Sequence, residues 1–154
     1  MRGSRWDDPT TGRQVLLLCV DGPEALAGWP SEPPWEQRDL LLLLATHATI
    51  EQTHLGDLPL RWLSQGLVYF GAWGPGCATL EDLVDEDVVG DGSSPALHVL
   101  TASFPGEPID DALAMLMSYD GDAAGPLRVV LAVGCDRAVE RALDRRGSEP
   151  LAAS

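Results

Sequence analysis

The chain has 154 residues, 45% of them hydrophobic, and a formal net charge of −14. This length suits one domain with a buried core, and the acidic excess opposes binding to nucleic-acid phosphates. All ten basic residues are arginines, so a Walker A loop, a Schiff-base lysine and the protein-kinase lysine are excluded. No apolar run reaches the length of a membrane span or of a signal-peptide core, so we expect a cytoplasmic protein that binds neither membranes nor nucleic acid.

The first half of the chain predicts a tail, a strand and a long helix. Residues 1–13 are polar, which predicts a flexible N-terminal tail, and the apolar run Gln14–Val20 predicts a strand buried on both faces. Trp35–Thr53 predicts a helix, because leucine and alanine favour helix. Its five leucines, Leu40–Leu44, would cover every face of that helix, so we expect burial on most sides or a homo-oligomer interface there. A buried strand at 40–46 is the alternative.

The second half of the chain alternates strands with helices. Leu58–Gln65 is predicted to be a short helix or a turn. Strands are predicted at Gly66–Trp73, Leu97–Ser103 and Leu127–Val133, and helices at Cys77–Val88, Pro108–Tyr119 and Asp136–Arg146. Residues 148–154 are predicted to be a flexible C-terminal tail. The alternation predicts a single α/β domain over residues 14–147. Its sheet is expected to be mainly parallel and four-stranded, with helices on both faces, as in Rossmann-like or flavodoxin-like folds.

A binding edge follows from this topology, because open parallel sheets bind ligands beyond the carboxyl ends of their strands. The residues predicted to share that edge are Asp21, Trp73, Gly74, Gly76, Cys77, Thr101, Ser103 and Asp136. Cys77 is the candidate catalytic residue among them, since a helix N-terminus favours a thiolate. We expect no metal and no cofactor, because the acids at 85–91 lack the calcium-loop spacing and the histidines are remote from the cysteines.

The segment LVYFGAWGPGC, Leu67–Cys77, resembles the strand and active-site turn of thioredoxins, which run into W-C-G-P-C. The resemblance covers only this strand and turn, and it implies a thioredoxin-like fold as an alternative. Gly74 stands where thioredoxins have the attacking cysteine, and Cys77 matches only the second cysteine. A dithiol cycle is therefore excluded, and the resemblance implies only a single reactive thiol, at Cys77.

A second resemblance covers residues 66–117. The turn Trp73–Cys77, the acidic stretch Leu80–Glu86, Thr101 and the segment Ile109–Leu113 are together similar to a family of small uncharacterised bacterial α/β domains. This resemblance implies no activity. It implies that the turn and the edge at Thr101 occur together in members of that family.

These observations favour a non-catalytic, acidic protein-interaction or regulatory module of a bacterial cytoplasmic system. Its expected partner is a protein, and the acidity of the chain suits a basic one. The leucine run Leu40–Leu44 adds the expectation of a homo-oligomer. Two alternatives stay open: a thiol-dependent redox enzyme or sensor using Cys77, and a nucleotide-binding sensor at the carboxyl edge of the sheet.

Overall fold

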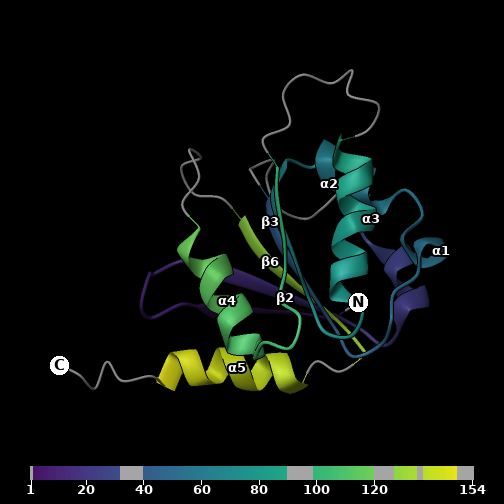
Figure 1. The fold of residues 1–154 in the computed structure, drawn as a ribbon. Helices are drawn as coiled ribbons and strands as arrows, with labels where there is room; N and C mark the ends of the chain where they lie inside the picture. The colour runs from purple at the N-terminus through teal and green to yellow at the C-terminus, as the bar shows by residue number, and fades with distance from the viewer. Residues whose placement is uncertain (1, 32–39, 90–98, 120–126, 135–136, 149–154) are drawn as a thin grey trace.

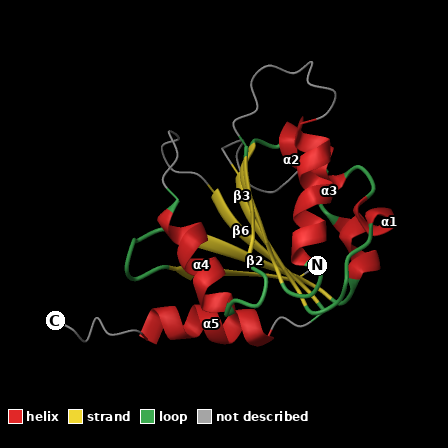
Figure 2. Cartoon of the chain, viewed as in Figure 1, coloured by secondary structure: helices red, strands yellow, loops and turns green. Residues whose placement is uncertain are grey.

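The computed structural model describes residues 2–31, 40–89, 99–119, 127–134 and 137–148 (Figure 1). They form one six-stranded sheet with helices on both of its faces (Figure 2). The strands are β1 (Arg2–Asp7), β2 (Gln14–Val20), β3 (Leu40–Thr46), β4 (Leu67–Trp73), β5 (Leu100–Ser103) and β6 (Leu127–Val133). The helices are the 3₁₀-helix η1 (Pro23–Gly28) and the α-helices α1 (Gln52–Leu55), α2 (Leu58–Ser64), α3 (Cys77–Val89), α4 (Ile109–Ser118) and α5 (Arg137–Ser148).

The sheet has the order β1-β2-β6-β3-β4-β5, and all of its strands except β1 are parallel. The prediction of a mainly parallel α/β sheet is confirmed, but the number of strands was wrong, because there are six and not four. The prediction of a flexible N-terminal tail at residues 1–13 was also wrong in part, because Arg2–Asp7 form strand β1. Strand β1 pairs antiparallel with β2, from Arg2 opposite Cys19 to Asp7 opposite Gln14. Its polar sequence reflects an exposed edge strand, which does not show the apolar pattern of a buried one.

Strand β3 corrects the prediction of a long helix at Trp35–Thr53 and confirms the alternative of a buried strand at 40–46. It lies between β6 and β4, and all five leucines of Leu40–Leu44 have an exposed fraction of 0%. Successive side chains of a strand point to opposite faces, so Leu40, Leu42 and Leu44 pack on one side of the sheet and the other two on the opposite side. The run is therefore a central strand of this chain, and it is not a surface for self-association.

Right-handed crossovers explain which helices cover which face. From β2 through β3 and β4 to β5 the chain moves toward one edge, and η1, α1, α2 and α3 cover one face. From β5 it returns to insert β6 between β2 and β3, so α4 and then α5 cover the opposite face (Figure 1). This strand order differs from both the Rossmann and the flavodoxin order. The thioredoxin-like alternative does not fit either, because β6 is parallel and central and does not end the fold in an antiparallel hairpin.

Both faces of the sheet carry an apolar core. On the face of α3, Trp62 stacks on Phe70 with ring centroids 5.6 Å apart and meets Trp29 edge to face at 5.8 Å. On the face of α4, Leu113 and Leu116 pack over the odd-numbered leucines of β3. Of the helices that the structure describes, none is both long and apolar enough to cross a membrane.

Candidate functional site

The carboxyl ends of four neighbouring strands lie level with one another. Val133 of β6 is opposite Val20 of β2 and Thr46 of β3, and Trp73 of β4 is opposite Ala45. Two backbone bonds continue the ladder past the strand ends: Gly134 N–H donates to Val20 O at 3.0 Å, and His47 N–H donates to Val133 O at 3.2 Å. Asp21 and the turn at 73–77 therefore lie on one edge, where the sequence placed them.

The turn between β4 and α3 is built on a close approach of two backbones. Gly74 has a φ of 111°, and a Cβ atom at this position would collide with the carbonyl oxygen of Thr46. Thr46 is buried, and its hydroxyl donates to Ala48 O at 2.6 Å, which fixes the neighbouring loop. Gly76 has a φ of 71° but meets only the side chain of Thr49, at an ordinary distance. Packing between β3 and β4 thus accounts for Gly74 without a phosphate ligand.

Cys77 begins α3 with its thiol inside the core. Its exposed fraction is 2%, and it belongs to the same apolar cluster as Leu80 and Val84. Its backbone N–H donates to Gly74 O at 3.1 Å and closes the turn. A reactive thiol has to meet its substrate, and buried structural cysteines are generally inert. The geometry therefore does not support a thiol site at Cys77.

His47 is a residue of this edge that the sequence interpretation missed. The exposed imidazole meets the indole of Trp73 edge to face, with centroids 5.4 Å apart, and Trp73 Nε1 donates to Glu107 O at 2.7 Å. Placing residues 35–53 in a helix had removed His47 from the strand ends. Assigning 40–46 to a strand would have put His47 directly after its carboxyl end.

Of the other predicted edge residues, Thr101 lies away from the strand ends and Ser103 lies at the carboxyl end of β5. Thr101 is the second residue of β5, and its hydroxyl donates to Asp85 Oδ1 of α3 at 3.4 Å. Ser103 ends β5 opposite Ala72, while Asp136 falls outside the described residues. Thr101 thus does not belong to this edge, and ligand binding at the carboxyl edge stays a prediction. Among the residues that the structure describes, no three His, Cys, Asp or Glu side chains are grouped so that they could hold a metal ion.

Helix α3 and strand β5 form a second surface, which is strongly acidic. α3 packs on β4 and β5 and contains no basic residue. Its acidic side chains make no ion pair within the described part of the chain. One exposed apolar side chain adjoins them: Val89 at the end of α3 is 58% exposed, whereas Leu100 of β5, which is 50% exposed, lies on the opposite face of the sheet, beside Tyr69. The acidic side chains of this α3–β5 surface are Glu81, Asp82, Asp85, Glu86 and Asp87.

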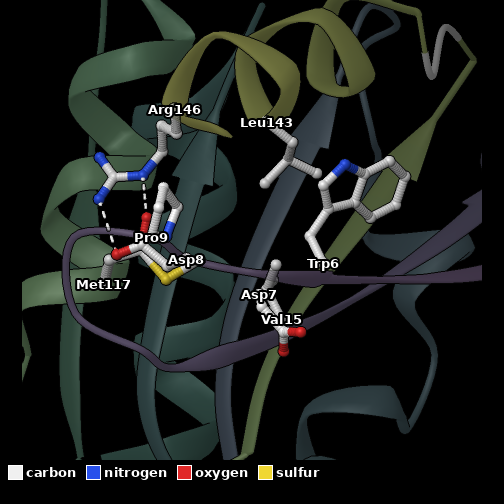
Figure 3. A pocket seen from close by; sticks show the side chains of 8 residues that line it. All are labelled: Trp6, Asp7, Asp8, Pro9, Val15, Met117, Leu143 and Arg146. Atoms are coloured by element: carbon white, nitrogen blue, oxygen red, sulfur yellow. Dashed lines mark hydrogen bonds and ion pairs between the residues drawn. The ribbon is translucent and has the colours of Figure 1, made fainter. Parts of the chain in front are cut away.

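The opposite side of the molecule has a small hollow between β1 and α5 (Figure 3). Its enclosed space is about that of one water molecule. Asp8 lies at this hollow and accepts hydrogen bonds from Arg146 Nε at 3.0 Å and from the Thr11 hydroxyl at 2.6 Å. Burial alone would raise the pKa of Asp8, but these bonds and the charge of Arg146 outweigh it and hold the pKa below its ordinary value. At this hollow the ion pair between Asp8 and Arg146 links the end of β1 to α5, so its role is structural.

Arg128 has a similar structural role. It is buried at the second residue of β6, and it donates to Leu116 O at 3.2 Å and to Tyr119 O at 2.7 Å. These carbonyls lie at the C-terminal end of α4, where the helix leaves acceptors unpaired and where positive charge is favourable. Burial and the nearby charge of Arg13 lower the pKa of Arg128 to about 10, so the side chain remains charged at neutral pH. This arginine holds α4 against the sheet and is not available to a ligand.

A family model described as a domain of unknown function, DUF7684, matches residues 15–144. The matched residues run from the first buried residue of β2 into α5, so they cover all or most of every element described above except β1. No curated protein matches the chain.

Proposed function

Because the chain belongs to the DUF7684 family, whose description names no activity, we propose its function from its own surface: it is a non-catalytic interaction module that binds a basic protein partner on the α3–β5 surface. The single observation that carries the proposal is the composition of that surface, where acidic side chains that form no ion pair with the described residues adjoin the exposed Val89. Charge would attract and orient a basic partner, and Val89 would supply apolar contact.

The position of the acids along α3 supports a binding role. Asp85, Glu86 and Asp87 lie toward the C-terminal end of the helix, where the helix dipole disfavours negative charge. Asp82 and Glu86 are also four residues apart, a spacing at which like charges destabilise a helix. Helix α4 follows the favourable rule and carries its acids in the first turn. The acids of α3 thus lower the stability of the helix, and a bound basic partner would reduce this electrostatic repulsion.

The setting that we propose is a bacterial cytoplasmic system in which binding regulates the partner. Cys77 is buried and forms no disulfide within the described residues, which fits a reducing compartment.

The proposal is tested by neutralising the acidic surface. A fluorescein-labelled oligo-arginine peptide is titrated with the protein at about 50 mM and about 300 mM NaCl, because screening weakens exposed charge interactions. We expect binding at low salt that weakens at high salt. The triple variant Asp82→Asn, Asp85→Asn, Glu86→Gln should lose at least about tenfold in affinity, since each exposed charge contributes up to about 1 kcal/mol.

A matched control changes the net charge equally elsewhere. The variant Asp7→Asn, Glu24→Gln, Glu107→Gln neutralises three exposed acids that form no ion pair with any described residue. If both triple variants weaken binding equally, the peptide senses only net charge and the proposal is wrong. The α3 variant should also unfold at the same or higher urea concentration than the wild type, because it removes unfavourable charges from the helix end.

A further inference from the structure

Strand β5 is an open edge of the sheet. It pairs with β4 alone, and no described segment pairs with its outer side. Phe104 N–H donates to Ala72 O at 3.0 Å, and this bond shows which backbone groups at the β5 edge face β4. The backbone groups of alternate residues point to the same side, so those of Leu100, Ala102 and Phe104 point toward β4. The N–H and C=O groups of Thr101 and Ser103 therefore point away from the sheet.

The two edges of the sheet differ in their protection against strand addition. Edge strands that avoid pairing usually carry charged side chains or proline. Strand β1 has the sequence RGSRWD, with exposed charges at Arg5 and Asp7. Strand β5 has the sequence LTAS, with no charge and no proline, and Leu100 is half exposed. Of the two edges, β5 is the one that is suited to accept another strand.

The charge beside β5 indicates what kind of strand fits. The Thr101 side chain contacts Asp85, so the α3 side of an added strand would face the acidic surface. On the opposite face, β5 offers Leu100 and Ala102. Since side chains of a strand alternate between faces, a matching strand would alternate basic and apolar residues.

A second copy of the chain is a poor occupant of this edge. Each copy carries a net charge of −14, and pairing two β5 strands would bring two acidic α3 surfaces toward each other. Pairing β5 with β1 of another copy would be head to tail, and a contact of that kind leads to open assemblies unless the rotation closes. The exposed charges of β1 also oppose it.

We propose that β5 accepts an extended segment of a partner protein as an added strand, and that this segment alternates arginine or lysine with apolar residues. Thr101 and Ser103 exchange backbone hydrogen bonds with the segment, and Asp85 and Glu86 attract its basic side chains. Main-chain bonds supply affinity in this mode of recognition, and alternate side chains supply specificity. The inference rests on the proposed function, because it uses the same surface and the same class of partner.

The test compares two peptides of identical composition by fluorescence anisotropy. One is Arg-Val-Arg-Val-Arg-Val-Arg, and the other groups the residues as Arg-Arg-Arg-Arg-Val-Val-Val. We expect the alternating peptide to bind at least about tenfold more tightly, which corresponds to one or two extra backbone hydrogen bonds. In ¹H–¹⁵N spectra it should also slow amide exchange at Thr101 and Ser103.

The protein variants Thr101→Pro and Thr101→Val distinguish the contribution of the Thr101 backbone N–H to binding from that of its side chain. Proline removes an outward N–H without breaking the bonds to β4, so it should reduce binding of the alternating peptide about tenfold, while valine should leave it nearly unchanged. N-methylation of alternate peptide residues offers the same test with the wild-type protein. One methylation register should abolish the preference for the alternating peptide, and the other should not.

Each result has a distinct meaning. Equal binding of both peptides, with no effect of Thr101→Pro or of either methylation register, overturns strand addition and leaves the acidic binding surface intact. Failure of both peptides to bind overturns the proposed function itself. If light scattering shows a dimer that Thr101→Pro dissociates, a second copy occupies β5 and the inference is wrong.

Discussion

At the scale of single residues, Gly74 and Gly76 show how similar glycines can serve different needs. Both have positive φ, at 111° and 71°. Only Gly74 is pressed against the neighbouring strand, because its missing Cβ leaves room for the carbonyl of Thr46. The sequence pattern resembles a phosphate-binding or redox turn, but here it allows the turn after β4 to pack closely against the end of β3.

The pair gives a direct prediction. Gly74→Ala should lower the free energy of unfolding by at least about 3 kcal/mol, because it adds a backbone collision to the strain of positive φ. Gly76→Ala carries the strain alone and should cost about 1 kcal/mol. Urea unfolding of both variants measures the difference. Equal losses would mean that the approach to Thr46 does not constrain the turn.

Asp8 gives a prediction about acid stability. Its pKa is lower in the folded chain than the value of about 3.9 expected in the unfolded chain, so the ionised carboxylate stabilises the fold above that pH. This contribution is lost as the pH falls through the folded pKa. At pH 7, Asp8→Asn should lower the free energy of unfolding by about 3 kcal/mol, since it breaks a buried ion pair. Its stability should also depend less on pH below about 4.

The control for Asp8 is an exposed ion pair. Asp57 lies 3.4 Å from Arg61 on α2, with 68% of its own side chain exposed. Asp57→Asn should therefore change neither the stability at neutral pH nor its acid dependence noticeably. A flat stability curve for the wild type between pH 5 and about 2 would contradict the role of Asp8.

At the scale of elements, β3 shows why composition misled the sequence interpretation. Leucine favours helix in isolation, but burial on both faces of a sheet overrides this preference. The leucine run suits either structure, and the absence of periodicity in it could not decide between them. Strand β1 was missed for the opposite reason, since its exposed polar residues resemble a tail. The helices α3 and α4 were predicted well because their apolar residues recur with helical spacing.

Burial of β3 predicts a large effect at its centre. Leu42→Asp should prevent folding or cost more than about 4 kcal/mol, because the carboxylate would replace a fully buried side chain without a partner. Leu60→Asp on α2, where the leucine is 54% exposed, is the control and should cost less than about 1 kcal/mol. Circular dichroism and urea unfolding measure both. A folded Leu42→Asp protein that changes only its oligomeric state would restore the self-association hypothesis.

At the scale of the whole molecule, charge and topology are distributed unevenly. α5 carries four arginines on one face of the sheet, and α3 carries five acids and no basic residue on the other. Such a polarised surface orients an approaching charged partner. The sequence predicted the overall acidity but not its location, because the packing of α3 over β4 and β5 is a tertiary property.

Strand order was the part of the fold that the sequence could not supply. Alternation of strands and helices predicted parallel pairing and helices on both faces. It did not predict that β6 would lie between β2 and β3. That choice depends on which strands pair, and several strands have equally apolar sequences. Asp21 and Trp73 lie at strand ends as predicted, His47 was missed there because β3 had been assigned to a helix, and ligand binding at this edge stays a prediction.

The central position of β6 has a consequence for biosynthesis. It is the last described strand, and until it emerges from the ribosome β2 and β3 have no neighbour between them. The nascent chain then holds two separate half-sheets, each with an apolar unpaired strand that is a template for aggregation. Closure joins residues as distant in the chain as Val15 and Arg128, and such contacts slow folding. A chain that ends before Leu127 would therefore expose these strands to chaperones and proteases, whereas addition of β6 joins the two half-sheets.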